Sequence, residues 1–336
     1  MKKRILTGDR PTGKLHLGHY VGSIANRVKL QYDYEEYLLI ADVQALTTNF
    51  DHPERLALDV REVAMDNLAC GIDPKTTTIC VQSKIPEIFE LTSYFSMFTT
   101  VSSLRRNPTI KTEIKQLGLQ ENIMYGFLGY PVSQAADITI FEAHLVPVGE
   151  DQMPILEATR EIVRKFNRLY KDVLTEPDGL VGEVGRLVGT DGQAKMSKSL
   201  GNVIYLCDDE KAVEKKVGQM FTDPEKIRLG DKGHPHKCPV CIYHATFNLD
   251  KEEVDGLKKE CLSGKRGCVE CKKRLSEVLN SFLTPIREKR KIFEKNPDLV
   301  DDILITGIKK ARTVTTKTIE KVREAMKIDY FKGTHV

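Results

Sequence analysis

Two short stretches of this chain contain residues that could act on a phosphate. In residues 5–22 an apolar run gives way to a Gly/Pro turn, and His16, Gly18 and His19 follow where a helical pattern begins. A helix that starts after such a turn presents unpaired backbone N–H groups and the positive end of its dipole, which favours an anion. We therefore expect a phosphate-binding loop between a strand and a helix.

The second stretch is residues 195–199, Lys-Met-Ser-Lys-Ser, which follows the Gly-rich residues 187–194. Two lysines three positions apart, interleaved with hydroxyl groups, can form a cationic clamp on phosphate oxygens. Each stretch also has an explanation without function: the first could be only the start of a helix, and the second an exposed Lys/Ser linker. Their occurrence together, in this order, is more specific than either one.

A third group of residues suits a large aromatic ligand that carries a polar group. Tyr130, Gln134 and Asp137 are spaced i, i+4 and i+7, which puts them on one face of a helix. An aromatic ring, an amide and a carboxylate among alanines could hold such a ligand. An ordinary amphipathic helix has the same spacing, so the pattern alone leaves that alternative open.

Five of the eight cysteines lie within residues 238–271 and could hold a metal. They contain two CxxC pairs, at 238/241 and 268/271, which are typical of a tetrahedral zinc site, although the 26 residues between the pairs exceed the usual gap. The other partition takes Cys238, Cys261, Cys268 and Cys271, four thiolates that suit either zinc or an iron–sulfur cluster. Unligated thiols are the third alternative.

The elements that must position these residues alternate between strands and helices. Apolar runs predict strands at 4–8, 37–41 and 77–81, with helices over 18–32 and 53–71 between them. This order of near-continuous apolar strands predicts an α/β fold with a doubly wound parallel sheet. Such a sheet binds its ligand at the carboxyl ends of its strands.

The rest of the chain predicts a helical continuation. Residues 86–143 are helix-rich, 144–148 resemble a further strand, and a long helix follows to about residue 167. Residues 228–272 are predicted to be rich in turns, and the pattern from 273 onwards is helical with a break near Asn296-Pro297. We expect a catalytic domain over 1–205 and a helical domain over 206–336.

Composition indicates a globular protein. Of the 336 residues, 40% are hydrophobic and 29% charged, and no run reaches the ~18 apolar residues of a membrane span. The start of the chain lacks the apolar core of a signal peptide, so we expect a cytoplasmic location without disulfides. Net charge is only +3, but residues 251–336 carry 21 Lys/Arg against 14 Asp/Glu, which fits a polyanionic partner or a solvated helical surface.

Taken together, residues 16–19 (His-Leu-Gly-His) and 195–199 resemble the HIGH and KMSKS elements of class I aminoacyl-tRNA synthetases. Residues 8–16, 41–46 and 146–152 resemble the tryptophanyl-tRNA synthetases of that class in particular. The resemblance covers nearly the whole chain. It implies a Rossmann-type catalytic domain and an α-helical C-terminal domain that reads the tRNA anticodon.

The resemblance also implies a reaction and its partners. The chain would activate L-tryptophan with ATP and Mg²⁺ to tryptophanyl-adenylate, release pyrophosphate, and transfer tryptophan to tRNA(Trp), as a cytoplasmic homodimer. Because the carboxylate of the amino acid itself attacks the α-phosphate, catalysis needs positioning and charge stabilisation rather than an enzyme nucleophile.

Individual roles follow from the same resemblance. The catalytic residues would be Lys195, Lys198, His16 and His19. ATP would contact Arg10, Thr12, Gly18, His19, Gly149, Asp151, Lys195, Met196, Ser197 and Lys198. Tryptophan would contact Leu6, Gly8, Gln44, Tyr130, Gln134, Asp137, Val146, Val148 and Gln152.

Within the tryptophan site, Asp137 would accept the indole N–H and Val146 and Val148 would line the ring slot. Tyr130, Gln134 and Gln152 would hold the α-amino group. The metal ligands would be Cys238, Cys261, Cys268 and Cys271, whose spacing matches the [4Fe–4S] motif of some family members. Structural Zn²⁺ is the alternative.

Two other functions stay open from the sequence. A tyrosyl-tRNA synthetase shares the pattern of Tyr130, Gln134 and Asp137, but residues 11–13 and 149–152 favour the tryptophanyl family. A regulatory protein that senses an amino acid without charging tRNA belongs to a different class. The two ATP elements and the basic C-terminal region argue against it.

Overall fold

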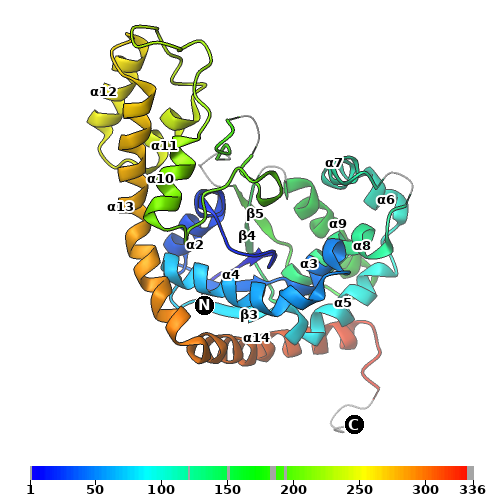
Figure 1. The fold of residues 1–336 in the computed structure, drawn as a ribbon. Coiled ribbons are helices and arrows are strands. Elements are labelled where there is room, and N and C mark those ends of the chain that lie inside the picture. The colour runs from blue at the N-terminus through cyan, green and yellow to red at the C-terminus, as the bar shows by residue number, and fades with distance from the viewer. Residues whose placement is uncertain (1, 120–121, 150–151, 182–186, 193–194, 331–336) are drawn as a thin grey trace.

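A single five-stranded parallel sheet forms the centre of the molecule (Figure 1). The computed structural model describes residues 2–119, 122–149, 152–181, 187–192 and 195–330. The strands are β1 (Arg4–Asp9), β2 (Glu35–Ile40), β3 (Thr78–Val81), β4 (Leu145–Val148) and β5 (Asp178–Val181). Their order across the sheet is β3-β2-β1-β4-β5, and every neighbouring pair is parallel. The predicted α/β, Rossmann-type parallel sheet is confirmed.

Helices follow each strand. In the first part of the chain they are α1 (Leu17–His19), a π-helical turn (Tyr20–Ile24), α2 (Ala25–Leu30), α3 (Asp42–Asn49), α4 (Leu56–Cys70), α5 (Pro86–Ser96), α6 (Val101–Arg106), α7 (Pro108–Leu117), α8 (Tyr125–Ile140) and α9 (Met153–Leu169). The last part adds α10 (Glu210–Gly218), α11 (Pro239–Phe247), α12 (Lys251–Leu262), α13 (Cys268–Lys295) and α14 (Pro297–Ala325). Among the described residues, no helix is long and apolar enough to cross a membrane.

The sheet is buried on both faces, as its near-continuous apolar strands require. Along β2, Leu38 and Ile40 enter the core that contains α4, whereas Tyr37 and Leu39 enter the core that contains α5, α8 and α9. The chain leaves β1 toward β2 on one side and returns in β4 on the other. The carboxyl ends of β1 and β4 therefore meet at the topological switch point, where such sheets bind ligands.

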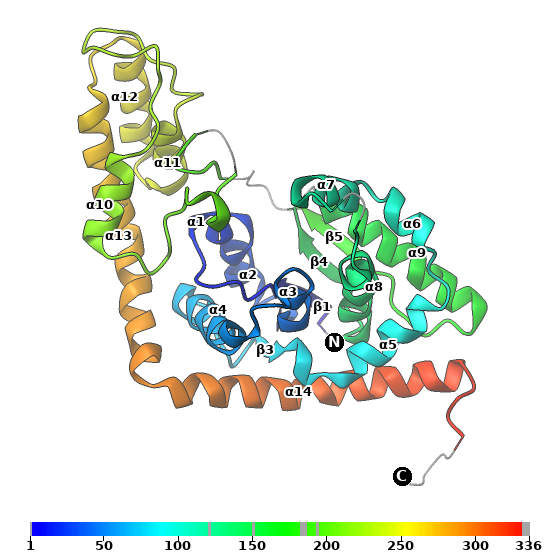
Figure 2. The same ribbon diagram turned by 45° about the vertical axis from the view of Figure 1, so that its right-hand side comes forward.

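The two C-terminal helices connect the far end of the molecule to the sheet (Figure 2). α13 packs against α4, and α14 packs along the edge strand β3. A Cβ atom on Gly307 of α14 would lie 1.8 Å from the carbonyl oxygen of Ile79, so only glycine permits this approach. The helix thereby covers the edge of the sheet. The predicted break at Asn296-Pro297 is confirmed, since α13 ends at Lys295.

Three details of the sequence prediction are wrong. The segment 228–272 was expected to be rich in turns, but it contains α11 and α12. Most side chains of α11 are apolar, including Ile242 and Ala245 on its more exposed side, so its sequence has little helical period on which a prediction could depend. The other two details are the helix α3, which starts directly after β2, and the strand β5, neither of which was predicted.

Candidate active site

The histidines of the opening loop hold the start of the first helix in a tight turn. The Nδ1 atom of His16 accepts the Gly18 N–H at 3.1 Å, and Nδ1 of His19 accepts the His16 N–H at 3.2 Å. The centroids of the two rings are 3.8 Å apart. A Cβ atom on Gly18 would lie 2.9 Å from the His16 ring, so a larger residue would force the loop apart. The geometry depends on all three residues.

Both histidines are neutral at physiological pH. Burial, with His19, Lys198 and Lys195 nearby, lowers the pKa of His16 to about 2. Burial also lowers the pKa of His19 to about 4, although Asp9 opposes that shift. The positive charge of this loop therefore comes from lysines and backbone N–H groups, not from imidazolium.

A buried ion pair fixes the end of β1. Arg27 of α2 donates to the two carboxylate oxygens of Asp9 at 2.5 and 2.9 Å, and the Asn67 amide of α4 donates to Asp9 at 3.0 Å. Burial alone would raise the pKa of Asp9, but Arg27 outweighs it and lowers that pKa to about 2. The strand end is therefore rigid where the site begins.

The lysine loop packs directly onto the opening loop. Met196 is only 2% exposed, and its sulfur lies 3.3 Å from the backbone nitrogen of Gly18. The Nζ atom of Lys198 donates to the carbonyl oxygens of Gly13 at 2.8 Å and of Thr12 at 3.2 Å. Lys195 is exposed, and its charge lies near both histidines. The structure thus brings the two motifs together.

Asn202 holds the lysine loop in shape. Its Oδ1 accepts the Ser197 N–H at 2.7 Å, and its Nδ2 donates to Asp191 at 2.9 Å. Immediately afterwards, residues 204–206 pair with residues 15–17 through backbone hydrogen bonds of 3.0 Å. The C-terminal end of the loop is therefore tied to the start of α1.

The opening loop is also connected to the C-terminal helices. The Leu15 N–H donates to the carboxylate of Asp66 at 2.6 Å, and Arg290 of α13 pairs with that same carboxylate. Arg290 also pairs with Glu62 at 2.5 Å. Asp66 and Arg290 are 0% and 2% exposed, so this connection is shielded from solvent.

On the other side of the site, Asp137 of α8 is buried and hydrogen-bonded. The Nε2 atom of Gln82 lies 2.8 and 3.0 Å from its two oxygens, and the Gln44 N–H donates to Oε1 of Gln82 at 3.0 Å. Burial raises the pKa of Asp137 to about 7; the Gln82 bond lowers it and the charge of Asp42 raises it. The carboxylate is thus held in one orientation at the carboxyl end of the sheet.

Tyr130 of α8 contacts α7. Its hydroxyl donates to Glu113 at 2.8 Å, and the pKa of Tyr130 is raised by burial and by that carboxylate. Arg10, after β1, donates to Thr48 at 2.7 Å, and its charge lies close to Glu113 and Tyr130. The carboxylate of Glu113 therefore joins the site from α7.

The other predicted contacts lie on the same elements. Leu6 and Gly8 belong to β1, Val146 and Val148 to β4, and Gln134 to α8 between Tyr130 and Asp137. Gly149 follows β4, and its carbonyl accepts the Gln152 N–H at 2.9 Å, at the start of α9. Asp151 lies outside the described residues.

A separate cavity lies at the cysteine-rich end of the molecule. It is lined by Lys226, Arg266 and the five clustered cysteines, which are Cys238, Cys241, Cys261, Cys268 and Cys271. The neighbouring Cys241 thiol lowers the pKa of Cys238 and the pKa of Cys271, which favours a thiolate at these positions. No three of these sulfurs lie within 4.8 Å of one another.

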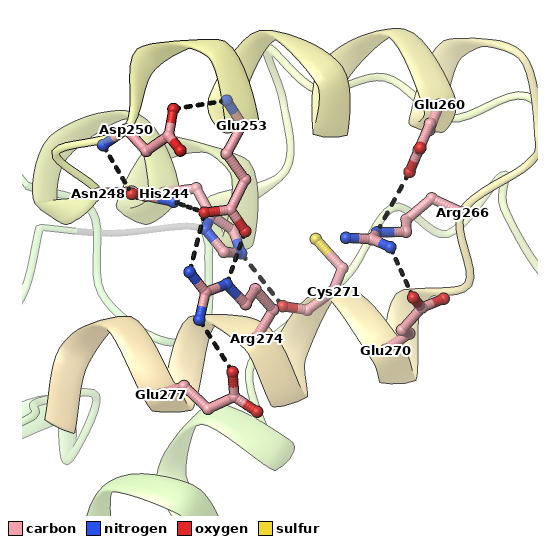
Figure 3. A network of polar contacts seen from close by, with 10 residues as sticks. All are labelled: His244, Asn248, Asp250, Glu253, Glu260, Arg266, Glu270, Cys271, Arg274 and Glu277. Carbon is pink, nitrogen blue, oxygen red and sulfur yellow. Dashed lines mark hydrogen bonds and ion pairs between the residues drawn. The ribbon is translucent and has the colours of Figure 1, made fainter. Parts of the chain in front are cut away.

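A network of polar contacts joins the helices next to this cavity (Figure 3). The His244 ring lies 3.1 Å from the Cys271 carbonyl oxygen, and Arg274 pairs with Glu253 of α12 at 2.6 Å. Arg266 pairs with Glu270 at 2.5 Å. These contacts join α11, α12 and the first turns of α13.

Sequence reasoning missed several residues of the site. They are Gln82, Glu113, Asn202 and the pairs Asp9–Arg27 and Asp66–Arg290. Gln82 directly follows a predicted strand, so its position at a carboxyl end was a usable signal. Glu113 and Arg290 reach the site only through the packing of distant helices, for which the local sequence has no signal.

Known proteins resemble this chain closely. A family model described as tRNA synthetases class I (W and Y) matches residues 1–284. The chain is 52% identical over 335 residues to the tryptophan–tRNA ligase of Clostridium longisporum, covering 98% of each chain. It is 50% identical over 339 residues to that of Lactococcus lactis, covering 98% of this chain and 99% of the relative.

A solved structure has the same overall fold. The tryptophanyl-tRNA synthetase from Campylobacter jejuni, complexed with ADP and tryptophan, superposes with a TM-score of 0.86 at 32% identity. The match covers 96% of this chain and 99% of that one.

Proposed function

The chain belongs to the class I tRNA synthetases. We infer that the site at the carboxyl ends of its strands carries out the reaction of that family with tryptophan. The chain activates L-tryptophan with ATP, forming tryptophanyl-adenylate and releasing pyrophosphate, and transfers the tryptophanyl group to its tRNA. The observation that carries this function is the contact of Met196 and Lys198 with the opening loop, which assembles both ATP elements at one end of the sheet.

For adenylation the chain has to align tryptophan with ATP and to place positive charge beside the phosphates. A carboxylate oxygen of tryptophan bonds to the α-phosphorus of ATP, and the bond from that phosphorus to the oxygen bridging to the β-phosphorus breaks. No proton has to be removed in this step, so neutral His16 and His19 suit it as hydrogen-bonding contacts. Lys195 and Lys198 would stabilise the charge that develops on the leaving pyrophosphate.

The remaining nucleotide contacts are assigned from the family. Gly18 has no side chain that could stand between the loop and the nucleotide, and a Cβ at this position would meet His16 and Met196. The other residues that we assign to ATP are Arg10, Thr12, Gly149, Asp151, Met196 and Ser197. Mg²⁺ would be held by phosphate oxygens, which it prefers to a cage of protein ligands.

The opposite wall would bind tryptophan. We assign the indole N–H to Asp137, whose carboxylate is buried and oriented by Gln82. Val146 and Val148 would flank the ring, and Tyr130, Gln134 and Gln152 would hold the α-amino group. Leu6, Gly8 and Gln44 would complete the pocket. A buried acceptor left without a donor is costly, so this wall would reject amino acids that lack the N–H group.

Charging assays test this function. Purified protein should exchange pyrophosphate into ATP only with tryptophan present, and should then load tryptophan onto tRNA(Trp). Binding of tryptophan without loading of any tRNA would instead support the regulatory alternative. Adenylation without transfer would place the failure in the tRNA step.

The cysteine-lined cavity would hold a [4Fe–4S] cluster on Cys238, Cys261, Cys268 and Cys271. These four cysteines line the cavity together with Cys241, and their spacing in the sequence matches the cluster motif of the family members that the chain resembles. Lys226 and Arg266 beside the cavity would offset the negative charge of the thiolates.

Metal analysis separates the alternatives for this cavity. Protein purified without oxygen should be brown and contain about four iron and four sulfide per chain. Colourless protein with one zinc per chain would replace the cluster with the zinc site, and metal-free protein would leave the thiols unligated.

The rest of the chain would serve tRNA binding. We propose that residues 1–205 form the catalytic domain and 206–336 the domain that reads the anticodon, with α13 reaching from the cysteine-lined cavity to α4 (Figure 1). The positive surplus of residues 251–336 supports contacts with tRNA phosphates. We further propose a cytoplasmic homodimer, which light scattering of the purified protein would test.

A further inference from the structure

The side chain of Gln82 connects α3 with α8 on the side of the site that we assign to tryptophan. It is 0% exposed and stands at the carboxyl end of β3, at the start of the short helix Gln82–Lys84. Its amide accepts the Gln44 N–H of α3 at 3.0 Å and donates toward the Asp137 carboxylate of α8. No motif that we identified in the sequence includes this residue.

Both contacts fix which way the amide points. The backbone N–H of Gln44 can only donate, so the oxygen of Gln82 must face it. The NH₂ group is left for Asp137, whose oxygens lie 2.8 and 3.0 Å from its nitrogen. One NH₂ group therefore spans both carboxylate oxygens and prevents the carboxylate from rotating, while lone pairs on those oxygens stay available to a ligand.

The carboxylate needs such a donor to remain charged. Asp137 is only 3% exposed, and the carboxylate of Asp42 lies close enough to disfavour its ionised form. Among the hydrogen bonds of the described residues, the side-chain donor to Asp137 is Gln82. A carboxylate is a stronger acceptor than a neutral carboxylic acid, so the donor controls how well Asp137 can accept an N–H.

We propose that Gln82 is a positioning residue for substrate selection, which holds the carboxyl group of Asp137 in one orientation as the acceptor for the indole N–H. The proposal rests on the role assigned to Asp137 above. It predicts that Gln82 governs discrimination between tryptophan and ring analogues without that N–H, and leaves ATP binding unaffected.

A structural role alone would have different consequences. Asp42 accepts the Ser83 N–H at 2.8 Å, so α3 is already attached to this segment beside the Gln82 contact. If Gln82 only joined α3 to β3, its loss would lower stability and leave the preference for tryptophan intact.

The test is pyrophosphate exchange with tryptophan and with β-(3-benzothienyl)alanine, in which sulfur replaces the indole N–H. For Gln82→Leu we expect kcat/KM for tryptophan to fall at least about tenfold, mainly through KM. The analogue should change less than about threefold, and KM for ATP should stay constant. An unchanged ratio of the two substrates in folded Gln82→Leu would overturn the proposal.

Gln82→Glu provides a second readout that keeps the shape of the side chain. Two carboxyl groups in contact must share a proton, so KM for tryptophan should become strongly dependent on pH between about 6 and 9. A KM with the same pH dependence as that of the wild type would also count against the proposal. This variant covers the case in which Gln82→Leu does not fold.

Gln31→Leu is the matched control. Gln31 is 1% exposed, and its amide donates to the Val28 and Gly71 carbonyls at 2.9 and 3.1 Å, so its loss also removes a buried amide. It should lower stability without changing the substrate ratio. Asp137→Asn separates the two levels of the proposal: if it abolishes the preference and Gln82→Leu does not, only the inference on Gln82 fails. If neither changes the preference, the assigned role of Asp137 fails.

Discussion

The candidate active site, which lies at the carboxyl ends of the strands and is called here the site above the sheet, differs from the cysteine-lined cavity in how its polar groups are held. Above the sheet, Asp9 is paired with Arg27, Asp66 with Arg290, and Asp137 with Gln82. In the cavity, five thiols surround a space and basic side chains stand beside them. In the first region each of these carboxylates already has a partner in the chain. In the second region the thiols face a cavity and could all bind one metal group.

This difference teaches what each region requires. A preorganised site spends no free energy on rearrangement when substrate arrives, which suits adenylation by positioning and charge. Thiolates near one another repel until a cation joins them, so a metal group would contribute to the stability of that end. Changes above the sheet should therefore alter rate or selectivity, and changes in the cavity should alter stability.

The largest expected effect lies above the sheet. Lys198→Ala should lower kcat for pyrophosphate exchange by about 10²–10³-fold, because one preorganised cation no longer faces the leaving phosphates. Thermal stability should change little, since the contacts of Lys198 Nζ are hydrogen bonds to Thr12 and Gly13 of the partly exposed opening loop. Lys211→Ala, at an exposed site on α10, is the control and should retain the wild-type rate. A loss of less than about fivefold in Lys198→Ala would contradict this assignment.

Replacement of cavity cysteines should produce the opposite pattern. Cys238→Ser with Cys271→Ser should abolish metal binding and lower Tm by at least about 5 °C, while exchange at 25 °C without tRNA stays within about threefold. Cys207→Ser, a half-buried thiol outside the cavity, is the control. Equal metal content and equal Tm in the double variant and the control would show that the cavity holds no ion.

A smaller effect concerns stability and pH above the sheet. Burial raises the pKa of Asp137 to about 7 from an ordinary value of 3.8, so ionisation of this group costs stability as pH rises from about 4 to 7. Asp137→Asn should therefore be more stable than the wild type above pH 7, by about 2–4 kcal/mol, with no difference below pH 4. Urea unfolding at both pH values measures this. Lower stability of the variant at pH 8 would show that contacts of the ionised Asp137 outweigh the free-energy cost of burying its charge.

The smallest effect is expected at the one departure from the common HIGH sequence. Leu17 is 0% exposed, and Leu17→Ile keeps its volume, so the free energy of unfolding should change by less than about 1.5 kcal/mol. The exchange rate should stay within about twofold of the wild type. A larger loss of rate without loss of stability would mean that the loop geometry depends on the shape of this side chain.

Local patterns in the sequence account for the fold well. Apolar runs placed four of the five strands, and Asn296-Pro297 placed the break between the last two helices, because both signals arise within a few residues. The strand β5 and the helix α11 were missed. β5 contains only two apolar residues, Leu180 and Val181, and α11 is apolar over most of its surface, which leaves little helical period in its sequence. The predicted domain boundary stays a prediction, although Arg290 of α13 is connected through Asp66 to Leu15 of the opening loop.

The site was predictable only where its residues form a motif. Residues 16–19 and 195–199 stand out as short strings, and the structure places them in contact. Gln82, Glu113 and Arg290 are single polar residues whose importance depends on which helix packs beside them. Such pairings are set by long-range packing, and one sequence does not encode them in any local spacing.

The central claim is that the residues over the sheet select and activate tryptophan. The most direct test is pyrophosphate exchange by the wild-type protein with tryptophan or tyrosine as the only amino acid. We predict a kcat/KM for tryptophan at least about 10³-fold above that for tyrosine, because the slot assigned to Val146 and Val148 and the position of Asp137 would fit the flat indole ring, and the relatives at about 50% identity are tryptophan–tRNA ligases. Equal or faster exchange with tyrosine would contradict the account.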